Sequence, residues 1–140
     1  MKKFIQSYLI TKWPAITWSA IVFVLLAMPG KGLLSEGFLS VWHLDKLIHA
    51  TLFFVLVWLW AHYLKTHKTI TWKTLFMIAL LATVYGIAME FVQIYTGRDF
   101  SVGDMVADGA GAFLAAIIKN KPRWKPGPQP KLTAYEKKVF

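Results

Sequence analysis

The sequence predicts an all-α protein, a four-helix transmembrane bundle with both termini in the cytoplasm and a short basic C-terminal tail. Three observations lead to this prediction. Hydrophobic residues make up 56% of the 140 residues, above the roughly 45–50% of ordinary soluble domains. They are gathered into four blocks, with most charged residues between the blocks or near their ends. The chain has no cysteine, so it has no disulfide framework and no thiolate metal site.

The four blocks are expected to form helices at about residues 13–28, 44–64, 72–94 and 103–118. Pro14 suits the first turn of the first helix, where its missing N–H leaves no bond unmade. The second and third blocks have the length of about twenty residues that a helix needs to cross a bilayer. The fourth block is shorter. Its small residues at Gly103, Ala107 and Gly111 predict close packing against another membrane helix.

The distribution of charge predicts the orientation of the chain. The N-terminus, the linker 65–73 and the C-terminal tail hold 13 of the 16 Lys and Arg residues. Because basic segments stay in the cytoplasm, we expect a membrane domain over residues 1–119 and a basic, Pro-rich cytoplasmic tail over residues 120–140. The net charge of +9 then follows from topology. It does not indicate nucleic-acid binding, since the apolar blocks lack the aromatic and basic interleaving of an RNA surface.

Polar residues near one set of helix ends form the candidate site. Charges inside membrane-length segments are costly, so they tend to face a bundle interior or a water-filled cavity. Eight such residues are predicted to line an outward-facing ligand-binding pocket: Asp45, Lys46, His49, Glu90, Gln93, Arg98, Asp104 and Asp108. His49 is the one side chain of the set that titrates near neutral pH. His49 and Glu90 are therefore the candidates for acid–base catalysis.

The two aspartates of the fourth helix also have structural interpretations. Asp104 follows Ser101 by three residues, the spacing of a capping box. Asp108 lies one turn deeper, where capping does not account for it. An ion pair, a ligand contact and a metal ligand all remain open for it. The cations and the histidine that it could pair with are Arg98, Lys46 and His49.

The remaining polar residues have similar alternatives. Arg98 either binds a phosphate or carboxylate group in a bidentate fork or holds Asp99 or Glu90. A buried Glu90 either pairs with a cation or takes up a proton, and Gln93 suits a hydrogen bond between helices. No cofactor and no metal site are predicted. The sequence has no GxSxG, no Walker loop and no metal-ligand motif such as HExxH.

Three segments resemble the VanZ-like family of small bacterial integral membrane proteins. They read DKLIHATLFFVLVWLW over Asp45–Trp60, YGIAMEFVQ over Tyr85–Gln93, and RDFSVGDMVADGAGAFLA over Arg98–Ala115. Together they span about the middle half of the chain, in the family's order and spacing. Members of the family often have Asn at the position of Asp108. The resemblance implies a multi-pass protein of the bacterial inner (plasma) membrane, and the family's namesake is associated with low-level resistance to teicoplanin.

The leading expectation is a cell-envelope protein, not an enzyme, whose pocket binds an amphiphilic lipid or lipopeptide. Arg98 and Lys46 would take its anionic group, with Asp45, Glu90 and Asp108 holding these two cations in place. The resemblance suggests a link to glycopeptide (teicoplanin) tolerance. One alternative is a membrane enzyme that acts on a lipid-linked substrate, with His49 or Glu90 as the acid–base group. Another is a structural assembly partner in which ion pairs fix the helix register. Membrane lipids are the expected partners, and the sequence does not set the oligomeric state.

Overall fold

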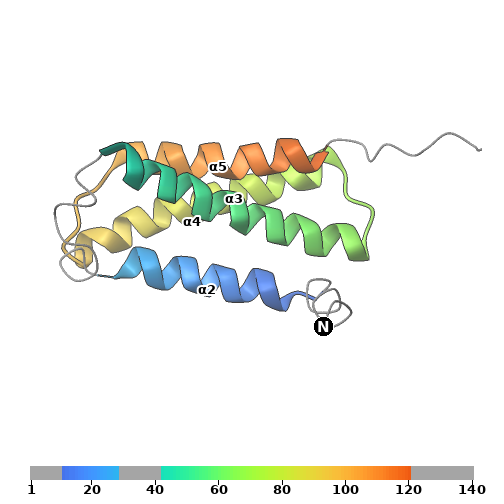
Figure 1. Cartoon of the computed structure of the whole chain (residues 1–140), viewed down its shortest axis with the longest axis horizontal. Helices are drawn as coiled ribbons and strands as arrows, with labels where there is room; N and C mark the ends of the chain where they lie inside the picture. Colours follow the sequence, from blue (N-terminus) through green and yellow to red (C-terminus); the bar gives the residue numbers. More distant parts are fainter. Residues whose placement is uncertain (1–10, 29–41, 121–140) are drawn as a thin grey trace, which may run out of the picture.

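The computed structural model describes residues 11–28 and 42–120 (Figure 1). Within these ranges the chain forms four helices and no strand, so the predicted all-α fold is confirmed. The helices are α2 (Trp13–Ala27), α3 (Trp42–His67), α4 (Trp72–Tyr95) and α5 (Val102–Asn120). α3 extends beyond the expected range 44–64 at both ends. The predicted basic tail, apart from Asn120, lies outside the described residues.

The turn between α4 and α5 follows directly from the sequence. Gly97 takes a left-handed backbone conformation, with a φ of 76°. The Arg98 N–H donates to the carbonyl of Gln93 at 3.0 Å, and the Gly97 N–H donates to that of Ile94 at 3.4 Å. This pair of bonds is the Schellman motif that commonly ends a helix at glycine. It places Arg98 immediately beside the end of α4.

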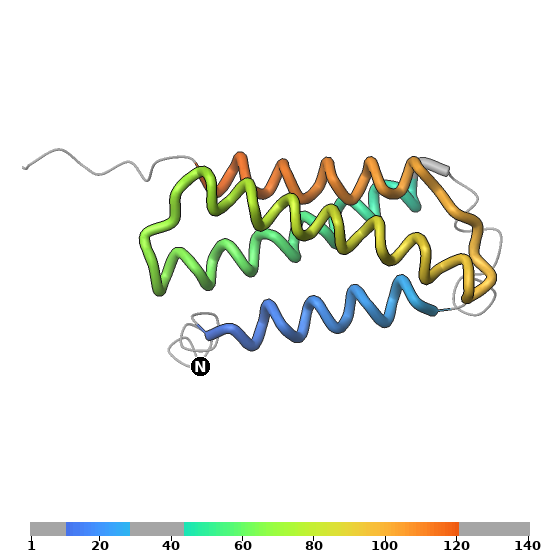
Figure 2. Tube along the Cα trace, turned by 180° about the vertical axis from the view of Figure 1, so that it is seen from behind, coloured from blue at the N-terminus to red at the C-terminus, as the bar shows by residue number. Residues whose placement is uncertain are grey.

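Figures 1 and 2 show α3 and α4 between the other two helices. α5 packs on one side of this pair and α2 packs on the other. The helices run alternately up and down, as short connections between neighbours require. One end of the bundle therefore gathers the start of α3, the end of α4 and the start of α5.

The contact between α3 and α5 is the closest in the structure, and small residues make it possible. A Cβ added at Gly111 would collide with the backbone carbonyl of Ala50. One at Gly103 would collide with the Lys46 ammonium. Ala112, Ala115 and Ala116 of α5 are fully buried. Close packing of the small-residue stripe agrees with its predicted role.

Two segments, Leu44–His67 and Trp72–Tyr95, are long and apolar enough to cross a bilayer. Within the described residues, α2 is shorter and α5 does not meet the same criterion. Among the described residues, the chain therefore has two helices of membrane-spanning length and composition. Four spans and cytoplasmic termini stay predictions.

Candidate functional site

The structure brings the eight predicted site residues to the same end of the bundle. Asp45, Lys46 and His49 lie in the first turns of α3, and Glu90 and Gln93 in the last turns of α4. Arg98 lies in the connection, and Asp104 and Asp108 lie in the first turns of α5. We call these eight residues the polar cluster. Five of its members are 0–4% exposed, and they are all the buried polar or charged residues within the described ranges: His49, Glu90, Gln93, Asp104 and Asp108.

The deepest pair of the polar cluster is His49 and Asp108. Nδ1 of His49 lies 3.0 Å from Oδ1 of Asp108, with both side chains almost fully buried. Of the three partners considered for Asp108, the structure selects the histidine. The second oxygen, Oδ2, has no hydrogen-bond partner in the described part of the chain. It faces Gly86, where an added Cβ would come within 2.5 Å of it. Gly86 thus makes room for Asp108, a role that the sequence did not reveal.

The Asp104 carboxylate does not take the capping role that its spacing from Ser101 predicted. Ser101 Oγ accepts the Asp104 N–H at 3.3 Å, which is half of a capping box. The other half is made by Glu90 of α4, whose Oε2 accepts the Ser101 N–H at 2.9 Å. The Asp104 carboxylate instead accepts a 2.9 Å bond from the Lys46 ammonium. The capping box is therefore shared between α4 and α5, and Asp104 links α5 to α3.

Arg98 faces Asp45, one of the three carboxylate residues expected to hold the two cations in place. Its Nη2 lies 3.9 Å from Oδ1 of Asp45, and both side chains are partly exposed. A pair at this distance and exposure contributes little to stability. Within the described residues this is the ion pair that Arg98 makes, in place of the expected Asp99 or Glu90.

Two further buried atoms of the polar cluster lack partners among the described residues: Oε1 of Glu90 and Nε2 of Gln93. The predicted hydrogen bond from Gln93 to another helix is thus not made by its amide nitrogen. A buried polar atom without a partner costs about 1–3 kcal/mol. Because of this cost, unpaired buried polar atoms in a native structure require an explanation, such as a functional role. Together with Oδ2 of Asp108, three buried polar atoms of the polar cluster thus lack a hydrogen-bond partner among the described residues.

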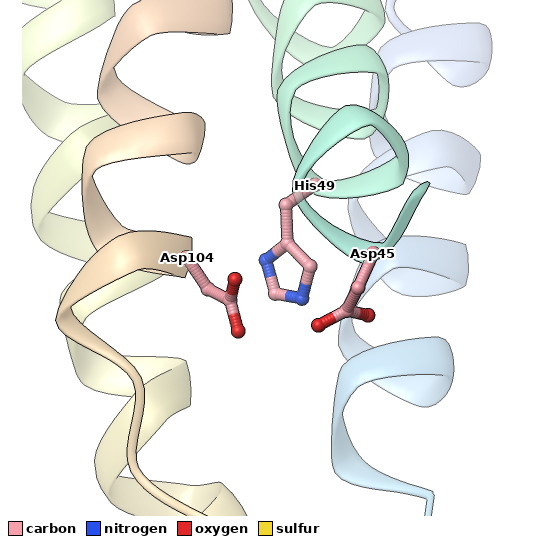
Figure 3. A group of neighbouring side chains, drawn as sticks. All are labelled: Asp45, His49 and Asp104. Carbon is pink, nitrogen blue, oxygen red and sulfur yellow. The ribbon is translucent and has the colours of Figure 1, made fainter. Parts of the chain in front are cut away.

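Three residues of the polar cluster could together hold a metal ion. One ring nitrogen of His49 and one carboxylate oxygen each of Asp45 and Asp104 lie within 4.8 Å of one another. Figure 3 shows the imidazole ring between the two carboxylates, which come from different helices. No metal site was predicted from the sequence, because Asp45 and His49 share a face of α3 whereas Asp104 comes from α5, and no known ligand motif joins the three.

An apolar cavity of about 630 Å³ lies elsewhere, between α2, α3 and α4. Its lining includes Leu56 and Trp60 of α3, and Leu81 and Tyr85 of α4. Ser19 of α2 joins them, and its Oγ accepts a 3.2 Å bond from Trp60 Nε1. No member of the polar cluster lines this cavity. The sequence analysis did not predict it.

Comparison of the chain with protein-family models, with curated proteins and with solved structures found no match. The resemblance to the VanZ-like family therefore stays a prediction that rests on the three segments named above.

Proposed function

We propose that the chain is a multi-pass protein of a bacterial inner membrane, and that its polar cluster binds an anionic amphiphile at the outer surface. The distribution of exposed side chains supports a membrane environment. Large apolar residues such as Phe23, Leu81, Phe91 and Val106 are each at least half exposed. By contrast, three acidic residues, Glu90, Asp104 and Asp108, are buried. Soluble monomers rarely expose so much contiguous apolar surface, and lipid would cover it.

The basic segments support an orientation in which the polar cluster faces away from the cytoplasm. The chain contains no cysteine, so single-cysteine variants report topology directly. Asp99→Cys lies at the polar end and Thr69→Cys at the opposite end, and both positions are exposed. A membrane-impermeant maleimide should label the Asp99→Cys variant in intact cells and the Thr69→Cys variant only after the cells are opened. The reverse pattern would contradict the orientation.

One observation carries the ligand proposal: two partly exposed cations stand beside a set of buried polar groups. The side chains of Lys46 and Arg98 are 27% and 24% exposed. Asp104 holds Lys46, and Asp45 lies 3.9 Å from Arg98, so both cations lie beside carboxylates at the partly exposed rim of the polar cluster. Charge-assisted hydrogen bonds from such groups are the usual means of holding a phosphate or carboxylate. A lipid or lipopeptide supplies that anion, and its apolar part would lie along the exposed apolar faces of the helices.

Native mass spectrometry of the detergent-purified protein tests this proposal. We expect phosphatidylglycerol to form more adducts with the wild type than the zwitterionic phosphatidylcholine does. Arg98→Ala should remove most of this preference. Lys73→Ala, which removes an exposed cation at the opposite end, should leave it unchanged. Equal binding by the two variants would contradict the proposal. Loss of the Arg98→Ala protein from the membrane would also contradict it, because Arg98 would then be a structural clamp.

The link to teicoplanin tolerance rests on the resemblance to the VanZ-like family alone. Expression in a teicoplanin-susceptible bacterium should raise the inhibitory concentration in an Arg98-dependent manner. An unchanged inhibitory concentration would remove the link and leave the binding proposal standing.

The pair His49–Asp108 favours one alternative, a membrane enzyme acting on a lipid-linked substrate. A carboxylate on Nδ1 orients an imidazole so that Nε2 can serve as a general base. Glu90 suits this role less well, since it is fully buried and one of its oxygens accepts the Ser101 N–H. Incubating the protein with its co-purified lipid distinguishes the two functions. A change in the lipid's mass that His49→Gln abolishes would favour the enzyme, and an unchanged lipid would favour binding.

A further inference from the structure

We propose that Asp45, His49 and Asp104 form a binding site for a single divalent transition-metal ion of the Zn²⁺ type, with Asp108 as the residue that orients the histidine. This inference goes beyond the proposed amphiphile binding and does not depend on it. It rests on the arrangement of four side chains from two helices.

Asp108 orients the imidazole ring of His49. Its Nδ1 lies at hydrogen-bond distance, 3.0 Å, from the Asp108 carboxylate. With Nδ1–H as the donor, the lone pair of the imidazole is on Nε2, which has no hydrogen-bond partner among the described residues. A carboxylate on the far nitrogen is the arrangement that accompanies most metal-binding histidines, because it fixes the ring and increases its basicity.

The carboxylates of Asp45 and Asp104 lie on either side of the His49 ring. Asp45 lies one turn before His49 on α3, and Asp104 lies one turn before Asp108 on α5. Residues four apart share a helix face, so both carboxylates stand beside the ring on the side nearer the end of the bundle. Figure 3 shows the ring directed between them. The side chain of His49 is buried and aimed at the centre of the group.

The distances between the three ligand atoms are close to those of a zinc site. Nitrogen and oxygen ligands bind Zn²⁺ at about 2.0–2.2 Å, which places them about 3.4 Å apart in a tetrahedron. A ring nitrogen of His49 and one oxygen from each of the two carboxylates lie within 4.8 Å of one another. They need to close by about 1.4 Å at most. Asp45 is partly exposed and its contact with Arg98 is long, so its side chain is able to make this movement.

The chemical types of the three ligands indicate which metal ion the site would bind. One imidazole and two carboxylates suit Zn²⁺ or a similar first-row dication better than Mg²⁺ or Ca²⁺, which prefer oxygen alone. Three protein ligands leave at least one position open. That position faces the partly exposed end of the polar cluster. The bound ion would therefore be accessible to an exogenous anion.

Lys46 is the competing cation. Its ammonium contacts Oδ1 of Asp104 at 2.9 Å, and the same carboxylate has a second oxygen for the metal. The ammonium lies close enough to repel a dication. Lys46→Gln should therefore bind the metal several-fold more tightly than the wild type. A structural ion-pair cluster predicts no metal binding in either protein.

The test uses the full-length chain, purified in detergent with its affinity tag removed and its metals stripped by a chelator. Titration with ZnCl₂, followed by calorimetry and by elemental analysis after desalting, should give one equivalent per chain. Asp45→Asn and His49→Gln should each weaken binding about tenfold or more. Two matched controls, Asp99→Asn and His62→Gln, should leave affinity and stoichiometry unchanged. They remove an exposed carboxylate and a histidine at the other end of α3.

Asp45→Asn decides the result even if His49→Gln fails to fold, since Asp45 is the least buried of the three ligands. Substoichiometric binding by the wild type would overturn the site, as would unchanged affinity in Asp45→Asn. Equal or weaker binding by Lys46→Gln would overturn the placement of the ion beside Asp104. Because no lipid enters the titration, its failure leaves the amphiphile proposal untouched.

Discussion

The two sides of the central helix pair are built differently. Towards α5, backbones approach until glycine is required, as at Gly111 against the Ala50 carbonyl. Charged groups line that contact at the polar end. Towards α2, bulky residues leave a cavity of about 630 Å³. There α2 is held by side chains that reach across, such as the Trp18 indole that donates to the Leu52 carbonyl at 3.0 Å.

This difference indicates where precise geometry matters in the molecule. Helices that touch through small residues have one register, because a shift would bring larger side chains into the contact. The register of α3 against α5 sets the distances within the polar cluster. The α2 side has room to adapt and positions none of the eight site residues. We therefore expect substitutions in the α3–α5 contact to disturb the polar cluster more than substitutions on the α2 side.

The largest effect is expected from the closest contact. Gly111→Ala introduces a Cβ against a backbone atom that cannot rotate away, and we expect a loss of about 3 kcal/mol in the free energy of unfolding. Gly109→Ala is the matched control on the same helix, since its Cβ would meet the Thr83 side chain at 3.5 Å, an ordinary contact. Unfolding in mixed micelles measures both. Equal stability of the two variants would show that the α3–α5 contact is not tight.

The buried pair within the polar cluster should come next. Asp108→Ala leaves Nδ1 of His49 buried without an acceptor, at an expected cost of about 2 kcal/mol. Asp108→Asn keeps an oxygen at that position and should remain close to the wild type. The same unfolding assay compares the two variants. A loss as large in the Asn variant as in the Ala variant would mean that the negative charge, and not the hydrogen bond, stabilises the pair.

The cavity side should tolerate added volume. Ala82 lines the cavity, so Ala82→Leu should change the free energy of unfolding by less than about 1 kcal/mol. Ala112→Leu makes the same change at a fully buried position of α5 and should destabilise the protein clearly more. A stability ranking of these two variants in detergent checks the contrast. Similar losses would contradict the claim that the two sides differ.

The smallest effect on stability is expected at the rim. The contact between Arg98 and Asp45 is long and partly exposed, so Arg98→Ala should cost less than about 0.5 kcal/mol. Its unfolding should match that of the wild type within error. A loss of several kcal/mol would assign Arg98 to the fold and not to a ligand.

Much of the architecture could be predicted from the sequence because helical blocks and small-residue stripes are local patterns. Two membrane-length blocks and the small-residue stripe ending at Gly111 predict much of the helix arrangement. The same arrangement brings the eight polar residues together, since residues at matching helix ends meet in an antiparallel bundle. These residues also stood out in the sequence because they are polar or charged residues within or beside apolar blocks.

The pairing within the polar cluster could not be predicted. The sequence offered three possible partners for Asp108, all expected near the same end of the bundle. Which of them it contacts depends on the rotation of α3 about its axis. The capping role of Glu90 for Ser101 depends on the separation of α4 and α5. Gly86 carries no local sequence signal, because its role depends on Asp108 of α5 lying opposite it. The α2 cavity arises from imperfect packing of bulky residues, which no periodicity encodes.

The central claim is that the charges of the polar cluster bind an anion and do not merely hold helices together. Exchanging the pair in one chain, Lys46→Asp with Asp104→Lys, tests it most directly, with unfolding and phosphatidylglycerol binding measured on the same preparation. We predict that the double variant recovers stability relative to the two single variants but does not bind the lipid. The cation then lies at a position that is 4% exposed, and a carboxylate occupies the rim. Recovery of both stability and lipid binding would show that these charges serve only one another.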